Sequence, residues 1–206
     1  MSGVSDSFRV ETFRPAFGRA LAATLMVICA FAALGVVGAG GDMVLRVWPW
    51  LALIAFFGWA AYWRPLVEVD VAGVHVVNVF RTFDVPWPAI DEIDTRWALT
   101  LNTRLGNVKA WAAPAPGRQL MRRARPEDQR LPGAARGDMV RPSDLSQTES
   151  GAAALIVRQR WAQLRKAGYL DDAKVEFDRM PVRWHYGVIA GFAVLAALAV
   201  YCTWLA

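Results

Sequence analysis

Three long apolar blocks constrain this chain more than any other feature of its sequence. They cover residues 20–40, 47–63 and 184–206, and none of them contains Asp, Glu, Lys or Arg. About 20 apolar residues are needed to cross the hydrocarbon core of a bilayer as a helix, and 17 is the short end of that range. We therefore predict three transmembrane helices. Only Gly41–Arg46 separates the first two, which predicts a helical hairpin over residues 20–63.

The first block has a competing interpretation as a cleavable signal peptide, because small residues follow it at Gly38, Ala39 and Gly40. The 19 residues before it carry Asp6 and Glu11 and are long for the leader of such a peptide, so an uncleaved anchor is favoured.

Basic residues at the ends of the blocks predict the orientation. Short flanks rich in Lys and Arg stay in the cytoplasm. The loop of the hairpin carries only Arg46, whereas the other flanks carry Arg9, Arg14, Arg19, Arg64, Arg179 and Arg183. We therefore predict a multi-pass plasma-membrane protein with a cytoplasmic N-terminal segment 1–19, a cytoplasmic central domain and the C-terminus outside.

The central region begins with the alternation of a β-sheet. Residues 67–71 alternate valine with acidic residues, Ala72-Gly73 makes a turn, and residues 74–80 form the return strand. Proline is excluded from central strand positions, so Pro86 and Pro88 interrupt the sheet. A long strand over 93–101, with Trp97 on its buried face, and a second strand over 108–112 then follow.

A change of composition follows these strands. Residues 113–149 are predicted to be an irregular basic loop, because Pro, Gly, Arg, Asp and Ser dominate and no periodicity persists. A helix is predicted over 150–167, capped by Thr148 or Ser150 and stopped before Gly168. It completes a domain over 64–170, and a charged connector, 171–183, leads to the third span.

The central sequence resembles a known family. Its W-P-A-I-D-E-I, R-W-A-L-T-L and A-W-A-A-P-A-P-G-R segments, set between two spans and a third, are similar to the membrane-anchored bacterial pleckstrin-homology (PH) domain proteins of actinobacteria. The resemblance implies an α+β integral membrane protein: three transmembrane helices plus a cytoplasmic, bent antiparallel sheet or partial barrel closed by a C-terminal helix. Only about five strands can be recognised where a PH barrel has seven, and the missing strands would have to come from the irregular loop.

Two groups of residues are candidate contact sites. Arg118, Arg122, Arg123 and Arg125 could attract anionic lipid or a protein partner, with a solvated charged loop as the alternative. Gly187 and Gly191 lie four residues apart on one helical face, where another helix could approach closely. Packing within the chain's own hairpin is favoured there, and a homo-oligomer formed through the third span is the alternative.

Other classes of function are disfavoured. Only two histidines and two cysteines are present, both cysteines lie inside predicted spans, and no metal-binding spacing or nucleophile–base pair can be recognised, so we predict neither an enzyme nor a cofactor. The segment 64–183 carries 19 Lys and Arg against 15 Asp and Glu, an excess that orientation in the membrane explains without nucleic acid. The sequence predicts a non-enzymatic, membrane-anchored binding or scaffold protein. The alternative is an accessory subunit of a larger membrane complex, held through its transmembrane helices.

Overall fold

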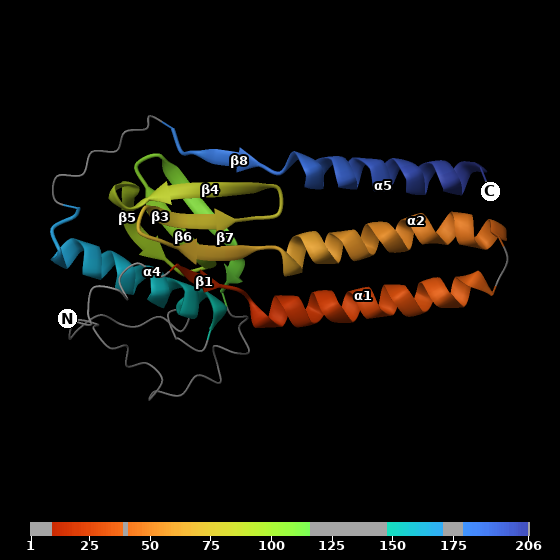
Figure 1. Cartoon of the computed structure of the whole chain (residues 1–206), viewed down its shortest axis with the longest axis horizontal. Coiled ribbons are helices and arrows are strands. Elements are labelled where there is room, and N and C mark those ends of the chain that lie inside the picture. The colour runs from red at the N-terminus through yellow and green to blue at the C-terminus, as the bar shows by residue number, and fades with distance from the viewer. Residues whose placement is uncertain (1–9, 39–40, 116–147, 171–178, 206) are drawn as a thin grey trace. The chain divides into compact units, whose positions relative to one another are not determined.

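The computed structural model describes residues 10–38, 41–115, 148–170 and 179–205 (Figure 1). These residues form two compact units, one helical and one rich in β-strands. Among the described residues, the helical unit combines 15–38, 41–65, 79–81 and 184–205, and the β-rich unit combines 10–14, 66–78, 82–115, 148–170 and 179–183. Both units are therefore assembled from segments that are distant in sequence.

The helical unit contains α1 (Ala16–Val37), α2 (Gly41–Gly58) and α5 (Tyr186–Leu205), and α2 continues into the π-helical segment η2 (Trp59–Trp63). All three helices, with η2 counted as part of the second, are long and apolar enough to cross a membrane. The second helix already begins at Gly41 rather than at residue 47, so the residues predicted to form the hairpin loop are largely helical. The acidic Asp42 in its first turn suits the positive end of a helix dipole.

Close approach between the helices depends on small residues. A Cβ atom added at Gly58 of α2 would lie 2.7 Å from a methyl group of Leu25 in α1. At one end of the unit, a Cβ at Gly18 would lie 3.3 Å from the carbonyl oxygen of Tyr62. At the other end, the indole of Trp50 donates a hydrogen bond of 3.0 Å to the hydroxyl of Thr203. The second helix thus runs antiparallel to α1 and α5 and contacts both.

The β-rich unit contains two antiparallel sheets. The first has the order β1-β2-β3-β4-β8 and the second the order β5-β6-β7. The strands are β1 (Glu11–Phe13), β2 (Leu66–Val69), β3 (Gly73–Val77), β4 (Arg81–Pro86), β5 (Ile90–Asp94), β6 (Ala98–Thr103), β7 (Gly106–Pro114) and β8 (Val182–Trp184). The two strands that the sequence pattern did not reveal, β1 and β8, come from the predicted N-terminal segment and the predicted connector.

The single long strand predicted over 93–101 is wrong. The carboxylate of Asp94 accepts hydrogen bonds from the backbone N–H groups of Thr95 (2.9 Å) and Arg96 (3.2 Å). A side chain that satisfies the next two backbone donors turns the chain, so β5 ends at Asp94 and β6 begins only at Ala98. Trp97 lies in this turn and is 79% exposed, in contrast to its predicted place in the core.

The core lies between the sheets and helix α4 (Glu149–Lys166), which corresponds to the helix predicted over 150–167. Thr148 caps it, because its hydroxyl accepts a hydrogen bond of 3.0 Å from the N–H of Gly151. Ala153 and Val157 are fully buried on the face of α4 that packs on the sheets. The alternating valines of β2 and β3 and the leucines of β6 belong to the same buried core, together with residues of β7.

Candidate functional site

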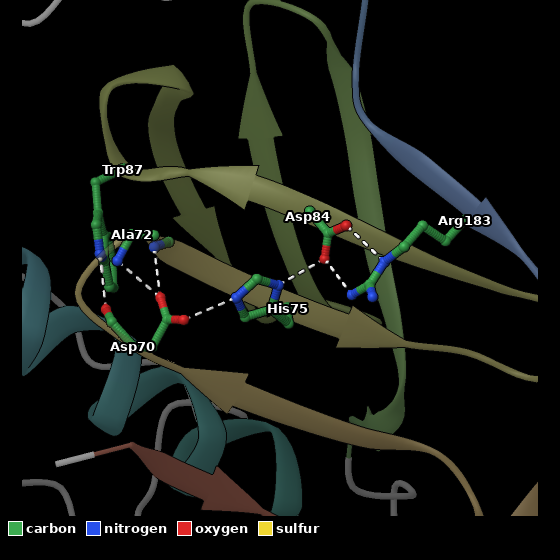
Figure 2. Close-up of polar contacts among 7 residues, drawn as sticks. Asp70, Ala72, His75, Asp84, Trp87 and Arg183 are labelled. Carbon is green, nitrogen blue, oxygen red and sulfur yellow. Dashed lines mark hydrogen bonds and ion pairs between the residues drawn. The ribbon is translucent and has the colours of Figure 1, made fainter.

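A histidine between two carboxylates is the most developed polar cluster among the described residues. It depends on the register of two hairpins. The pairing of β3 with β4 places His75 directly opposite Asp84. In the turn before β3, Asp70 accepts hydrogen bonds of 2.8 Å from the N–H groups of Ala72 and Gly73. This local turn directs the second oxygen of the Asp70 carboxylate toward the imidazole (Figure 2).

Both imidazole nitrogens of His75 face carboxylate oxygens. Nδ1 lies 2.5 Å from Oδ1 of Asp84, and Nε2 lies 3.0 Å from Oδ2 of Asp70. A carboxylate only accepts hydrogen bonds, so both contacts are satisfied only when both nitrogens carry protons. The geometry therefore selects the charged imidazolium form of His75.

The cluster continues to strand β8. Nε and Nη2 of Arg183 lie 2.8 Å and 2.9 Å from the two oxygens of Asp84, which is a bidentate ion pair. The backbone N–H of Asp84 also donates a hydrogen bond of 3.1 Å to the carbonyl of Pro181. The carboxylate of Asp84 therefore joins the β3–β4 hairpin to the strand that leads to α5.

A tryptophan secures the other end of the cluster. The indole Nε1 of Trp87 donates a hydrogen bond of 3.0 Å to the backbone carbonyl of Asp70 (Figure 2). Trp87 begins the short 3-10 helix η3 (Trp87–Ala89) and is buried. The interruption of the sheet at Pro86 and Pro88 thus places a buried, hydrogen-bonded aromatic side chain next to the Asp70 turn.

The contacts shift the pKa values of the participants. Burial alone would lower the pKa of His75, but its hydrogen bonds to Asp84 and Asp70 and their negative charges raise it above 6.5. Burial would raise the pKa of Asp84, but Arg183 and His75 lower it below 3.8. The pKa of Asp70 is lowered in the same way, against the effect of burial, by the backbone N–H of Gly73 and by His75. The two carboxylates, the imidazolium and the guanidinium then balance in charge.

The cluster can bind a proton at His75, and it connects β8 to the β3–β4 hairpin. The side chains of His75 and Asp84 are each 25% exposed, so solvent reaches them. Within the described part of the chain, no group of three or more His, Cys, Asp or Glu side chains has the arrangement of a metal site. The cluster therefore behaves as a titratable connection between β8 and the β3–β4 hairpin.

The arginine site that the sequence predicts cannot be located relative to the His75 cluster. Arg118, Arg122, Arg123 and Arg125 lie outside the described residues. The Gly187 and Gly191 pair is described, and the two positions differ. A Cβ atom at Gly191 would lie 2.7 Å from the ring tip of Phe56 in α2, whereas one at Gly187 would meet nothing within 4 Å. The close approach that Gly191 permits is thus made within the chain.

Sequence reasoning did not identify the His75 cluster. The return strand was predicted over 74–80, which runs through the turn before β4 and gives no pairing of His75 with Asp84. A four-residue turn over 78–81 would have paired Val77 with Thr82 and therefore His75 with Asp84, so the hairpin sequence allowed this pairing to be predicted. The participation of Arg183, 99 residues further along the chain from Asp84, has no such local signal.

Comparison with known proteins gives one match. No curated protein and no solved structure matches the chain. A family model described as the bacterial PH domain matches residues 64–141. Two bent antiparallel sheets with a helix packed on them are compatible with that fold. Residues 64–141 of this chain are therefore similar to the bacterial PH domain.

Proposed function

We propose that the chain is a non-enzymatic, membrane-anchored binding protein whose PH-like domain works at the membrane surface. The domain contacts a protein partner or anionic lipid there. The similarity to the bacterial PH domain supports a binding or scaffold role, because PH domains generally bind rather than catalyse. The three apolar helices support membrane anchoring.

The observation that carries this proposal is the shortness of the connections between strands and helices. β1 ends at Phe13 and α1 begins at Ala16; η2 ends at Trp63 and β2 begins at Leu66. Only His185 separates β8 from α5. An extended residue spans at most about 3.5 Å, so each connection reaches about 10 Å or less. If the helices are inserted, the PH-like domain stays next to the bilayer and can meet only membrane lipids or partners that come to the surface.

The residues proposed for that contact are Arg118, Arg122, Arg123 and Arg125. A group of basic side chains near a cytoplasmic leaflet attracts anionic lipid by about 1 kcal/mol for each charge, and the attraction is screened by salt. The same charges would suit an acidic surface on a protein partner. The proposal places the N-terminus and the domain in the cytoplasm and the C-terminus outside.

The test uses the full-length protein, extracted with mild detergent from its native membrane and examined by mass spectrometry for bound proteins and lipids. One variant changes the four arginines to Gln. A matched control removes four positive charges elsewhere, at Arg96, Arg104, Lys109 and Lys166. Loss of a stoichiometric partner, or of anionic lipid, from the first variant alone supports the proposal. Equal retention by wild type and both variants would contradict it.

An accessory subunit of a larger membrane complex is the second candidate. A shallow apolar hollow of about 280 Å³ between α1 and α2 favours it, because four of its lining residues are small. They are Ala30, Ala33, Ala52 and Ala55. Small residues at a helix surface allow a further helix to pack closely. Substituting Ala33 and Ala52 by Leu would then remove a partner that the arginine variant retains.

A further inference from the structure

Val79, Phe80 and Arg81, which connect β3 to β4 and include the first residue of β4, belong to the helical unit, although β3 and the rest of β4 belong to the β-rich unit. Hydrogen bonds to two carbonyl groups of this turn attach it there. The N–H of His185, directly before α5, donates a hydrogen bond of 2.8 Å to the carbonyl of Phe80. Nη1 of Arg64, directly after η2, donates one of 3.1 Å to the carbonyl of Val79. The turn is therefore attached to the ends of two candidate membrane helices.

Phe80 packs against the side of α5. Its ring lies 5.8 Å from the ring of Phe192, in an edge-to-face contact, and Phe192 in turn lies 4.9 Å from Phe56 of α2. Phe192 is six residues beyond Tyr186, which is about 9 Å along the helix axis. Nevertheless, 45% of Phe80 remains exposed. The ring thus joins the aromatic cluster of the helices while a large part of Phe80 remains accessible.

Arginine–tryptophan pairs surround this end of the helical unit. The guanidinium of Arg81 lies 5.7 Å from the ring centre of Trp184, and that of Arg19 lies 4.9 Å from the ring centre of Trp63. Tryptophan is enriched where membrane helices meet the headgroups, and arginine side chains extend from that level toward phosphate. Arg19 and Trp63 belong to α1 and η2, whereas Arg81 begins β4 and Trp184 ends β8.

Acidic residues are scarce in the sequence of the helical unit. Across residues 15–65, 79–81 and 184–206 the sequence contains a single acidic residue, Asp42. It lies in the first turn of α2, about 30 Å along the helix from Trp63. Arg19 and Arg81 are exposed, and an anionic headgroup would complement their positive charge.

We propose that the β3–β4 turn, Val79–Arg81, is a membrane-contacting element: Phe80 enters the boundary between headgroups and acyl chains, and Arg81 and Arg19 bind the phosphate of an anionic bilayer lipid. The inference rests on the proposed function, since it requires that the three helices are inserted. It assigns a lipid contact to residues 79–81, which lie within the range matched by the family model, in addition to Arg118, Arg122, Arg123 and Arg125.

The first test measures depth in the bilayer. Single cysteines are introduced into the full-length protein, in a background with C29A and C202A, and labelled with an environment-sensitive fluorophore. The protein is reconstituted in nanodiscs, with or without lipids that carry a quencher on the acyl chain. Phe80→Cys reports the turn. Val71→Cys is the matched control, because Val71 is 48% exposed and lies beyond the opposite end of β3. Val194→Cys, in α5 and 64% exposed, reports insertion of the helix.

Quenching at position 80 at least about twofold stronger than at position 71 is the expected result. Quenching at 194 with equal, weak quenching at 80 and 71 would overturn this inference and leave the membrane-anchored binding protein standing. Weak quenching at 194 as well would overturn both, because α5 would not be inserted.

The second test measures headgroup binding in proteins without an engineered cysteine. Full-length wild type, Arg81→Gln, Arg19→Gln and the control Arg104→Gln are released from nanodiscs of mixed phosphatidylglycerol and phosphatidylcholine, and the retained lipids are counted by native mass spectrometry. Arg104 is exposed and pairs with Asp91 in the β-rich unit. Arg81→Gln and Arg19→Gln should each retain about half as much phosphatidylglycerol as wild type and Arg104→Gln. Identical retention by all four would overturn the proposed lipid contact.

Discussion

The side chain of Asn78 pairs with the backbone of Trp111 as a neighbouring β-strand would. Its amide oxygen accepts a hydrogen bond of 2.8 Å from the N–H of Trp111, and its amide nitrogen donates one of 2.9 Å to the carbonyl of Lys109. Asn78 directly follows β3 of the five-stranded sheet, and Trp111 belongs to β7 of the three-stranded sheet. One side chain therefore joins the two sheets where no strand continues between them.

We expect Asn78→Ala to lower the free energy of unfolding by about 1–2 kcal/mol, because two hydrogen bonds to backbone groups are lost at once. Hydrogen exchange of the β7 peptide, measured by mass spectrometry on the full-length protein in nanodiscs, should increase. Asn102→Ala is the control, since Asn102 makes an exposed 3.2 Å hydrogen bond to Glu92 inside one sheet. Equal exchange of β7 in both variants would show that Asn78 does not join the sheets.

We expect the attachment of β8 to weaken as the pH rises. The pKa of His75 is raised in the folded protein, so its stabilising contribution is complete below pH 6.5 and is lost as the pH rises through the folded value. The pKa values of Asp70 and Asp84 are lowered, so their contributions are present above pH 3.8 and are lost only as the pH falls through the folded values. Hydrogen exchange at β8, corrected for its intrinsic pH dependence, should therefore increase above neutral pH.

The control for this pH dependence is His75→Gln, which keeps hydrogen-bonding capacity but cannot be protonated. Its corrected exchange at β8 should not change between pH 6 and pH 9. The whole effect should be small, because Arg183 is 68% exposed and its ion pair with Asp84 is screened by solvent. The same pH dependence of corrected exchange at β8 in wild type and His75→Gln would show that protonation of His75 does not strengthen the attachment of β8.

The two glycines of α5 should respond differently to the same substitution. Gly191→Ala places a methyl group against the ring tip of Phe56, which also packs on Phe192, so we expect a loss of about 1–3 kcal/mol from overpacking. Gly187→Ala meets open space and should be neutral or slightly stabilising. Thermal unfolding of both variants in one detergent gives the comparison. A lower midpoint for Gly187→Ala would instead reveal a helix contact outside this chain.

Two tryptophans offer a similar contrast in the β-rich unit. Trp161 of α4 is partly buried and packs against the core, so Trp161→Ala should cost about 2–4 kcal/mol. Trp97 is 79% exposed, so Trp97→Ala should change the unfolding free energy by less than about 0.5 kcal/mol. Denaturant titration of the full-length protein measures both. A loss at Trp97 as large as that at Trp161 would contradict its exposed position.

The sequence predicted those parts of the fold that depend on local patterns. The cap at Thr148 and the buried positions Ala153 and Val157 follow from residue type and helical spacing, and both agree with α4. Ala72-Gly73 marked the β2–β3 turn correctly. Gly73 is required there because a Cβ atom would collide with the backbone of Val85.

The parts that sequence did not predict depend on distant partners or on single side chains. β1 and β8 have three residues each, too few to show alternation, and they exist because the β2 and β4 edges accept them. The turn after Asp94 was missed because the apolar alternation of Ile93 and Leu99 continues across it. In the polar cluster, His75 and Asp84 could have been paired from the hairpin, but nothing local indicates Arg183.

The strand order of the five-stranded sheet determines which residues a soluble version of the β-rich unit must include. Its outermost strands, β1 and β8, lie before the first apolar helix and directly before the last one, while the family match covers only residues 64–141. A truncated gene for residues 64–170 would omit both, leaving the backbone edges of β2 and β4 open to association with other chains. A soluble version should instead be recombined, with residues 10–14 fused ahead of Leu66 and the chain carried through Trp184.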